Sequence, residues 1–219
     1  MYPKVTPWYH SQNKILLPRI NMSLVKMIVG IVGPSGSGKS TLCKMLKKSE
    51  PDKYEHIKLD NYFKDPKTFP LKEGFKNWEL PSNLKFDELI KDLETLKGGQ
   101  RVYTRTFPKK AGASPKSLTL TPKPIILVEG FMLFKEPRLR EMLDLKIYLD
   151  IHPEKMLERR SIRFGADHIS DYDTKVAIPE FLEYGITQKE EADHVVNATR
   201  EQAKVIKEVK EIIRSALTA

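Results

Sequence analysis

The sequence has little of what secreted, zinc-binding and membrane-spanning proteins need. Its single cysteine, Cys43, cannot form a disulfide within the chain, and no cysteine and histidine cluster has the spacing of metal ligands. Apolar runs such as residues 125–128 are far shorter than the roughly 18 residues that indicate a membrane span. These absences exclude a disulfide-stapled scaffold, a zinc module and an integral membrane protein. They favour a reducing, cytoplasmic location without a membrane partner.

The chain is also short of the length that two domains require. Its 219 residues, 40% hydrophobic and 31% charged, suffice for one buried core. The formal net charge is +9, but four basic residues place +4 of it in residues 1–26, which contain no acid. In the remainder, acids are interspersed with the bases and no basic stretch carries regularly interleaved aromatic residues. This pattern disfavours a nucleic-acid partner.

Residues 1–26 differ in character from residues 27–219. The first segment contains three prolines and no sustained apolar period, which predicts an extended or disordered basic arm. It lacks the apolar run of a signal peptide, whereas a transit peptide and a start of synthesis at Met22 or Met27 remain alternatives. Residues 27–219 are predicted to form the single folded domain.

From Met27 onward, short apolar runs alternate with helical patterns, which is typical of an α/β fold with a parallel sheet. Apolar spacing predicts helices over residues 86–96 and 205–216, each with one apolar stripe. Prolines among polar residues at 103–124 predict a hairpin or a loop excursion. The predicted strands cover residues 27–32, 56–59, 125–128, 145–151 and 194–196.

A segment directly after the first predicted strand fits the phosphate-loop motif G-x-x-x-x-G-K-[ST], and a helical pattern follows it, as the motif requires. Glycines in such a loop let backbone N–H groups turn toward phosphate oxygens. Lys39 is expected to reach the β- and γ-phosphates, and the Ser40 hydroxyl is expected to bind Mg²⁺. Thr41 stands where a dinucleotide fold needs its third glycine, so the motif favours a nucleoside triphosphate over NAD. The predicted triphosphate-binding residues are Gly33, Pro34, Ser35, Gly36, Ser37, Gly38, Lys39, Ser40 and Thr41.

A phosphate loop also occurs in GTPases and ATPase motors. The residues that would bind the acceptor of the phosphoryl group are therefore needed to identify the reaction. The guanine-reading N-K-x-D motif is missing, and so is a second ATPase module. Asp60 follows the second predicted strand, where ligands bind in such sheets, and a carboxylate there can accept the proton of an attacking hydroxyl. In the next loop, Glu79 can accept two hydrogen bonds from a sugar diol while the Trp78 ring stacks. The alternatives are a helix cap for Asp60 and a surface Trp78 beside a solvated Glu79.

Three further charged residues complete the predicted site. Glu129 ends the third predicted strand at the same sheet edge as Gly33, where it can hold a Mg²⁺-bound water or assist Asp60. Arg159 and Arg163 lie four residues apart on one face of a predicted helix. Guanidinium groups there can stabilise the charge of a transferring phosphoryl group. A solvated charged face is the alternative for this helix.

Five ordered elements resemble the uridine kinase family of phosphate-loop kinases, including its nicotinamide riboside kinase relatives, over roughly residues 27–215. The elements that begin at Glu129 and at Arg159 are closer to nicotinamide riboside kinases. The later spacing of Tyr172, Pro179, Lys189 and Ala192-Asp193 is closer to uridine kinases. The five elements are the loop GPSGSGKST, the run D-x-[YF]-[YF]-K at Asp60, N-W-[DE]-x-P at Asn77, E-G-F-x-L-F at Glu129 and R-R-S-x-R at Arg159.

The resemblance implies a three-layer phosphate-loop fold with a five-stranded parallel sheet and a small arginine-bearing lid. It implies transfer of a phosphoryl group from ATP, with Mg²⁺, to the 5′-hydroxyl of a uridine- or cytidine-type ribonucleoside. Asp60 would be the general base, Glu79 the acceptor of the ribose diol, with Tyr62 and Trp78 beside it. Arg159 and Arg163 would be the lid arginines over the phosphates.

Two departures leave the acceptor open. Position 79 is Glu where Asp is usual, and residues 103–108 lack the set of tyrosine, aspartate and histidine that uridine kinases place around the pyrimidine. Nicotinamide riboside, a pantothenate-type alcohol and another small alcohol are therefore alternatives, as is GTP in place of ATP. A nucleotide-binding regulator or NTPase without an acceptor is the alternative from a different class. Related kinases are often dimers or tetramers, so a homo-oligomer is an open expectation.

Overall fold

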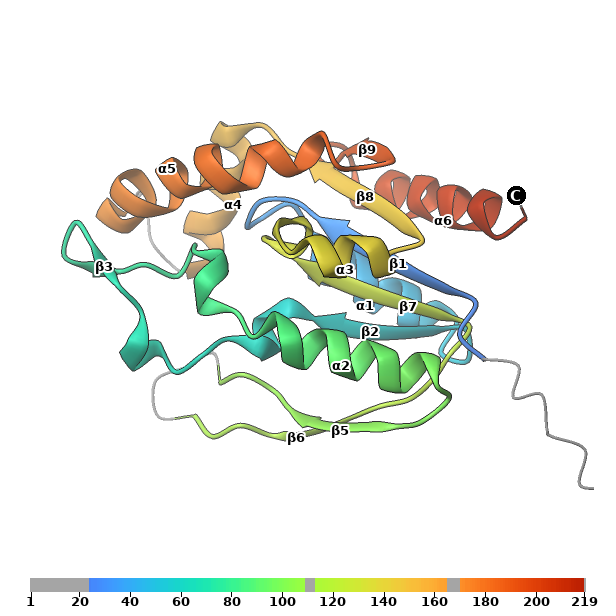
Figure 1. Ribbon diagram of the computed structural model, residues 1–219. Helices are drawn as coiled ribbons and strands as arrows, with labels where there is room; N and C mark the ends of the chain where they lie inside the picture. Colours follow the sequence, from blue (N-terminus) through green and yellow to red (C-terminus); the bar gives the residue numbers. More distant parts are fainter. Residues whose placement is uncertain (1–23, 109–112, 165–169, 219) are drawn as a thin grey trace, which may run out of the picture.

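The computed structural model describes residues 24–108, 113–164 and 170–218 (Figure 1). Most of the predicted basic arm lies outside these residues, so the arm stays a prediction. The strands are β1 (Met27–Val32), β2 (Tyr54–Lys58), β3 (Leu71–Lys72), β4 (Phe75–Lys76), β5 (Val102–Arg105), β6 (Ser117–Leu120), β7 (Ile125–Gly130), β8 (Leu145–Asp150) and β9 (His194–Asn197). The α-helices are α1 (Lys39–Ser49), α2 (Phe86–Lys97), α3 (Pro137–Met142), α4 (Pro153–Phe164), α5 (Ile178–Glu180) and α6 (Gln202–Thr218).

A five-stranded sheet forms the centre of the molecule, in the order β2-β7-β1-β8-β9, and all of its pairings are parallel. All six residues of β1 and all six of β7 are buried. Such strands read as near-continuous apolar runs because helices cover both faces of the sheet. The predicted fold class is confirmed, and each of the five predicted strands corresponds to a strand of this sheet within two residues at either end.

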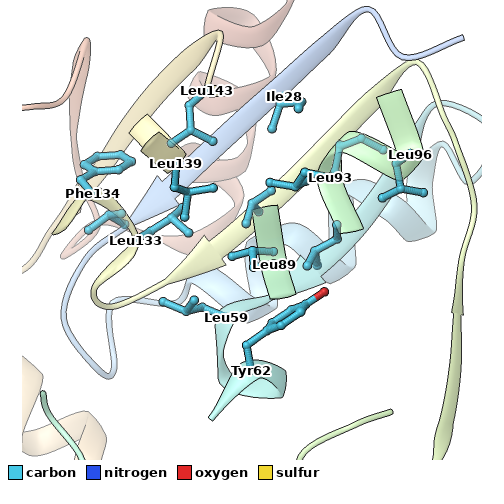
Figure 2. Close-up of a cluster of buried hydrophobic side chains, with 14 of the residues drawn as sticks. Ile28, Leu59, Tyr62, Leu89, Leu93, Leu96, Leu133, Phe134, Leu139 and Leu143 are labelled. Carbon is cyan, nitrogen blue, oxygen red and sulfur yellow. The ribbon is translucent and has the colours of Figure 1, made fainter. Parts of the chain in front are cut away.

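Alternate residues of β1 contribute to two cores on opposite faces of the sheet. Ile28 and Val32 pack with α2 and α3 in one cluster, part of which is shown in Figure 2. Met27, Val29 and Ile31 pack with α1 and α6 in the other. The result is the predicted arrangement of three layers, in which each helix buries one apolar stripe. Among the described helices, none is both long and apolar enough to cross a membrane.

Three features outside the sheet differ in how well the sequence predicted them. The excursion at residues 103–124 is a hairpin, in which β5 pairs with β6. The hairpin of β3 and β4 has two residues in each strand, too few to give a periodic signal. Residues 173–189 form a helical segment in which α5 lies between two π-turns, Asp173–Ala177 and Phe181–Gly185. The widened turns shift the side-chain spacing away from the helical period, and such turns are frequent at functional sites.

The strands β2 and β7 end close together at the edge that carries the phosphate loop. A 3₁₀ turn, η1 (Leu59–Tyr62), follows β2 directly. A Cβ atom at Gly130, the last residue of β7, would lie 2.5 Å from Cβ of Leu59, so only glycine permits this approach. Lys58 pairs with Glu129 in the same ladder. The close contact therefore holds η1, with Asp60, against the end of β7.

Replacing Gly130 with alanine is expected to lower the free energy of unfolding by about 1–3 kcal/mol, the usual cost of overpacking a core. Urea unfolding followed by circular dichroism measures the change. Gly98→Ala is the matched control, because its Cβ would meet its nearest neighbour at 3.4 Å. That control is expected to be neutral or more stable, since alanine restricts the unfolded chain. Equal stability of both variants would contradict the close contact at Gly130.

Candidate active site

The phosphate loop joins β1 to α1. Gly36 and Gly38 have φ angles of 90° and 93°, a backbone conformation that residues other than glycine rarely adopt. Gly38 is also the residue that precedes α1, so the positive end of the helix faces the loop. The buried Lys39 Nζ donates to the carbonyl oxygens of Gly33 at 2.7 Å and Pro34 at 2.9 Å, which holds the ammonium at the loop. This geometry suits a triphosphate, and its binding by residues 33–41 stays a prediction.

Ser40 and Glu129 meet next to the loop. Ser40 Oγ donates to Glu129 Oε1 at 2.6 Å. Burial by itself raises the pKa of Glu129, but the neighbouring His56 and Ser40 and the positive charge of Lys39 outweigh it and bring this pKa down to about 2. His56 Nε2 lies 3.4 Å from Glu129 Oε1. The carboxylate is therefore ionised at neutral pH, and nothing in the sequence pointed to His56 as its neighbour.

These two oxygen-bearing side chains fit a magnesium ion shared with a nucleotide. Mg²⁺ prefers oxygen ligands, is usually held by one or two protein groups, and completes its shell with phosphate oxygens and water. Among the described residues, no group of three or more histidine, cysteine, aspartate or glutamate side chains is placed to hold a metal ion. Ser40 and Glu129 would hold the ion together with the phosphates, and this role stays a prediction.

Asp60 lies inside η1 at the end of β2. The residue that precedes this turn is Lys58, so Asp60 is not its cap. The negative charge of Asp60 is one of the smaller causes that raise the pKa of Glu79, so the two carboxylates are near enough to interact electrostatically. The role of Asp60 as general base stays a prediction, and the alternative of a helix cap does not fit its position.

Glu79 lies at the centre of the predicted acceptor side. Its side chain is 17% exposed, and Tyr172 Oη donates to its Oε1 at 3.2 Å. Arg160 Nη2 lies 4.0 Å from the same oxygen, while Arg160 Nε donates to Asp173 Oδ1 at 2.7 Å. Burial raises the pKa of Glu79 above its ordinary value, although Arg160 and Tyr172 oppose the shift. The carboxylate thus lies beside a cation and a hydroxyl donor.

One pocket connects the two halves of the site. Pro34 and Ser35 of the phosphate loop line it, together with Glu79 and Arg160. The cavity among these residues is small, about 20 Å³, so it shows that the phosphate loop and Glu79 face a common space, and a ligand of nucleoside size would have to widen it. The other residues along its wall are Phe131, Met132, Met156, Ala177, Phe181 and Gly185.

The Trp78 ring belongs to a cluster of aromatic side chains. Its centroid lies 4.9 Å from that of Phe69, 5.5 Å from that of Phe63 and 6.1 Å from that of Phe107. Tyr62 lies elsewhere: it is buried beneath α2, and its hydroxyl donates to Asp92 at 2.8 Å (Figure 2). The prediction that Tyr62 contacts the acceptor does not fit this placement. In the pair Tyr62-Phe63, packing against α2 directs the tyrosine into the core and leaves Phe63 with Trp78.

The arginines of α4 are arranged differently from the sequence-based expectation. Arg159 Nη1 donates to the carbonyl oxygens of Gly36 and Ala198, both at 3.2 Å, so it lies at the phosphate loop. The side chain of Arg163 lies outside the described residues, and its lid role stays a prediction. Arg160, between them in the sequence, contacts the acceptor side. The only feature of the sequence that could have pointed to Arg160 was its place beside Arg159 in the R-R-S-x-R element.

Comparisons with known proteins agree with this geometry. The sequence model of the Phosphoribulokinase / Uridine kinase family matches residues 28–209. The chain is 32% identical to a uridine kinase of Chlamydia pneumoniae over 145 residues, which are 65% of each chain. It is 34% identical to a uridine kinase of Chloroflexus aurantiacus over 142 residues, which are 64% of this chain and 68% of that one. The aligned part therefore spans about two thirds of the length of these relatives.

Two solved structures share the fold. A structure described as a possible uridine kinase from Bacillus stearothermophilus has a TM-score of 0.55 at 19% identity, covering 79% of this chain and 89% of that chain. Shikimate kinase from Acinetobacter baumannii has a TM-score of 0.54 at 16% identity, covering 88% and 95%. The family model covers well over half of the chain, and the fold and the phosphate loop agree with it. The chain therefore belongs to the phosphoribulokinase/uridine kinase family, a family of ATP-dependent kinases.

Proposed function

We propose that this protein transfers the γ-phosphoryl group of ATP to the 5′-hydroxyl of a ribonucleoside, with Mg²⁺ as cofactor. The observation that carries the proposal is that Pro34 and Ser35 of the phosphate loop line the same pocket as Glu79. A regulator that only binds a nucleotide needs the loop but has no use for Glu79 and Asp60 beside it. Family membership and the uridine kinases among the relatives support the same reaction class.

In this mechanism, the acceptor side orients the sugar before transfer. The Glu79 carboxylate accepts hydrogen bonds from the 2′- and 3′-hydroxyls, and Tyr172 and Arg160 hold it in place. The 5′-hydroxyl then faces Asp60, which accepts its proton as the oxygen attacks the γ-phosphorus and the bond to ADP breaks. Asp60 later releases that proton to solvent.

On the donor side, positive charge offsets the charge of the transferring group. Lys39 and Arg159 both lie at the phosphate loop, where they can stabilise the equatorial oxygens of the phosphoryl group. Bound Mg²⁺ would supply further positive charge to offset the charge of the phosphates. Ser40 and the ionised Glu129 are the residues that would hold it.

Uridine and cytidine are the first acceptors to test, because the named relatives are uridine kinases. Nicotinamide riboside is the second. The rings that surround Trp78 are phenylalanines, and a flat cationic or neutral base can stack on such rings without a hydrogen-bonding partner. The ribosyl group common to these compounds is the part that Glu79 recognises.

A coupled assay of ADP release with ATP and Mg²⁺ tests the proposed function. The acceptor panel contains uridine, cytidine, nicotinamide riboside, 2′-deoxyuridine and pantothenate, with water as background. At least one ribosyl compound is expected to raise turnover well above hydrolysis, and its deoxy analogue is expected to be poorer. ADP release that no acceptor increases would contradict the proposal and favour an NTPase. Phosphorylation of pantothenate alone would reject the ribose-binding role of Glu79.

A further inference from the structure

Glu180 is a buried carboxylate on the helical segment of residues 173–189, outside the pocket lining. Its side chain is 4% exposed. Its Oε1 accepts hydrogen bonds from Asn77 Nδ2 and from Lys72 Nζ, each at 2.8 Å. Asn77 and Lys72 lie about one hundred residues earlier, on the β3–β4 hairpin and the loop after it. Glu180 therefore ties the helical segment to the part of the chain that leads to Glu79.

The contact with Asn77 fixes the orientation of its amide group. An asparagine side chain donates from one end and accepts at the other, so a carboxylate beside its nitrogen leaves the oxygen facing the opposite way. Asn77 Oδ1 accepts the backbone N–H of Glu79 at 3.0 Å. The Asn77 carbonyl in turn accepts from Asn83 Nδ2 at 2.7 Å. A chain of hydrogen bonds thus runs from Glu180 through Asn77 to the backbone of Glu79.

The burial of Glu180 is difficult to explain as stabilisation alone. Its Oε2 is buried and has no hydrogen-bond partner among the described residues. A buried carboxylate with an unpaired oxygen is costly, and an apolar side chain of similar volume is often at least as stable in such a place. What an apolar side chain cannot do is hold the Asn77 amide in one orientation. A carboxylate at position 180 is therefore better explained by its effect on the orientation of the Asn77 amide than by its effect on stability.

The same helical segment also contacts the part of the chain that carries Phe131. Gln188 is 1% exposed, and its Nε2 donates to the carbonyl oxygen of Phe131 at 2.7 Å. Its Oε1 accepts the backbone N–H of Phe134 at 2.9 Å. Phe131 lines the same pocket as Glu79. Polar contacts from one segment therefore fix both the Glu79 loop and the segment that carries Phe131.

We propose that Glu180 is a positioning residue for the acceptor: through Asn77 it sets the backbone of Glu79, and thereby the affinity for the sugar. This inference rests on the proposed function for its effect on the acceptor. Its structural part, the coupling of Glu180 to the Glu79 loop, holds independently of the substrate. The two parts have separate measurements, so the failure of one is distinguishable from the failure of the other.

The test compares Glu180→Leu, which cannot accept a hydrogen bond, with Glu180→Gln, whose amide oxygen still can. In Glu180→Leu, the KM for the best acceptor is expected to rise about tenfold, the effect of one lost charge-assisted hydrogen bond, with the KM for ATP within about twofold of wild type. Amide hydrogen exchange of residues 77–84, followed by mass spectrometry, is expected to become faster in this variant. Glu180→Gln is expected to restore slow exchange and most of the acceptor affinity.

Lys175→Met is the matched control on the same helical segment. Lys175 pairs only with the exposed Asp171 in the described contacts, so its removal is expected to leave both readouts unchanged. Glu180→Ala replaces the leucine variant should that one fail to fold. Wild-type exchange and wild-type acceptor KM in a folded Glu180→Leu or Glu180→Ala variant would overturn the proposal. So would damage in Glu180→Gln as large as in Glu180→Leu, since the charge and not the hydrogen bond would then matter. Faster exchange in a protein without acceptor activity would support the coupling and reject the proposed function.

Discussion

Asp60→Asn is expected to lower kcat by roughly 10²- to 10⁴-fold and to leave the affinity for ATP unchanged, which is the range for loss of a general base. Asparagine has nearly the same shape but cannot accept the proton of the 5′-hydroxyl at neutral pH. Asp60 lies in η1, at the end of β2, and its charge is felt at Glu79. The substitution therefore removes the base without removing a residue of the phosphate loop. Steady-state ADP release gives kcat, and calorimetry gives the dissociation constant of ATP–Mg²⁺.

The control for this variant is Asp52→Asn. Asp52 is fully exposed and pairs with Lys123 at the surface, so the same chemical change there is expected to leave kcat unaltered. Equal unfolding midpoints of the two variants would show that any loss of activity is local. Turnover of Asp60→Asn at the wild-type rate would mean that another group, or the phosphate itself, accepts the proton.

The second large effect is expected for Glu79→Gln, which should lower kcat/KM for the acceptor by about 10²-fold through the loss of two charge-assisted hydrogen bonds. The amide of glutamine has one acceptor oxygen in place of two. Its NH₂ group would face either the sugar diol or Arg160, and both of these need an acceptor at that point. The KM for ATP is expected to stay within about twofold of the wild-type value, since no described hydrogen bond joins Glu79 to the phosphate loop. The assay is ADP release at varied acceptor concentration.

A 2′-deoxy acceptor provides the matched comparison for Glu79→Gln. It forms one hydrogen bond fewer with Glu79, so the substitution is expected to harm it less than the ribonucleoside. An equal loss for the two acceptors would contradict diol recognition by this carboxylate.

The raised pKa of Glu79 adds a pH dependence with a definite sign. Burial is the main cause of that shift, so protonation occurs at a higher pH than for an exposed glutamate. A protonated carboxyl accepts fewer hydrogen bonds, and KM for the acceptor is therefore expected to rise as pH falls through this pKa. In Glu79→Gln, the same rise should be absent while the decline of kcat due to other groups persists. A KM that rises equally in both proteins would assign the titration to a different group.

The longer side chain at position 79 also has a structural counterpart. Glutamate carries its carboxylate one methylene further from the backbone than aspartate does. In this protein the extended carboxylate reaches Tyr172 and the vicinity of Arg160, both of which come from the region after β8. The departure from the usual aspartate is thus matched by partners from a distant part of the sequence. The hydrogen bond from Tyr172 and the contact with Arg160 give the carboxylate one defined position.

The sequence by itself determined the phosphate loop, the positions of the five sheet strands along the chain and the sheet edge at which the predicted site lies. These features depend on neighbours in the chain: a contiguous glycine-rich motif, apolar runs that must be buried on both faces, and strand ends that coincide in a parallel sheet. The predicted strand over residues 27–32 and the helix over 86–96 agree with β1 and α2 within one residue for this reason. The burial of Tyr62 and the aromatic ring partners of Trp78 were beyond such reasoning.

Only the tertiary structure decided where each of two adjacent residues lies. Packing beneath α2 took Tyr62 into the core, and the path of α4 directed Arg160 toward Glu79 and Arg159 toward the phosphate loop. Glu180 meets Asn77 across 103 residues of sequence, and no local pattern encodes that contact. The apolar period of a segment specifies which face of a helix or strand is buried, and a motif at the end of a strand specifies the edge of the sheet, because both follow from local geometry. Contacts between distant segments depend on how helices and loops pack, and the acceptor side of this site is made of such contacts.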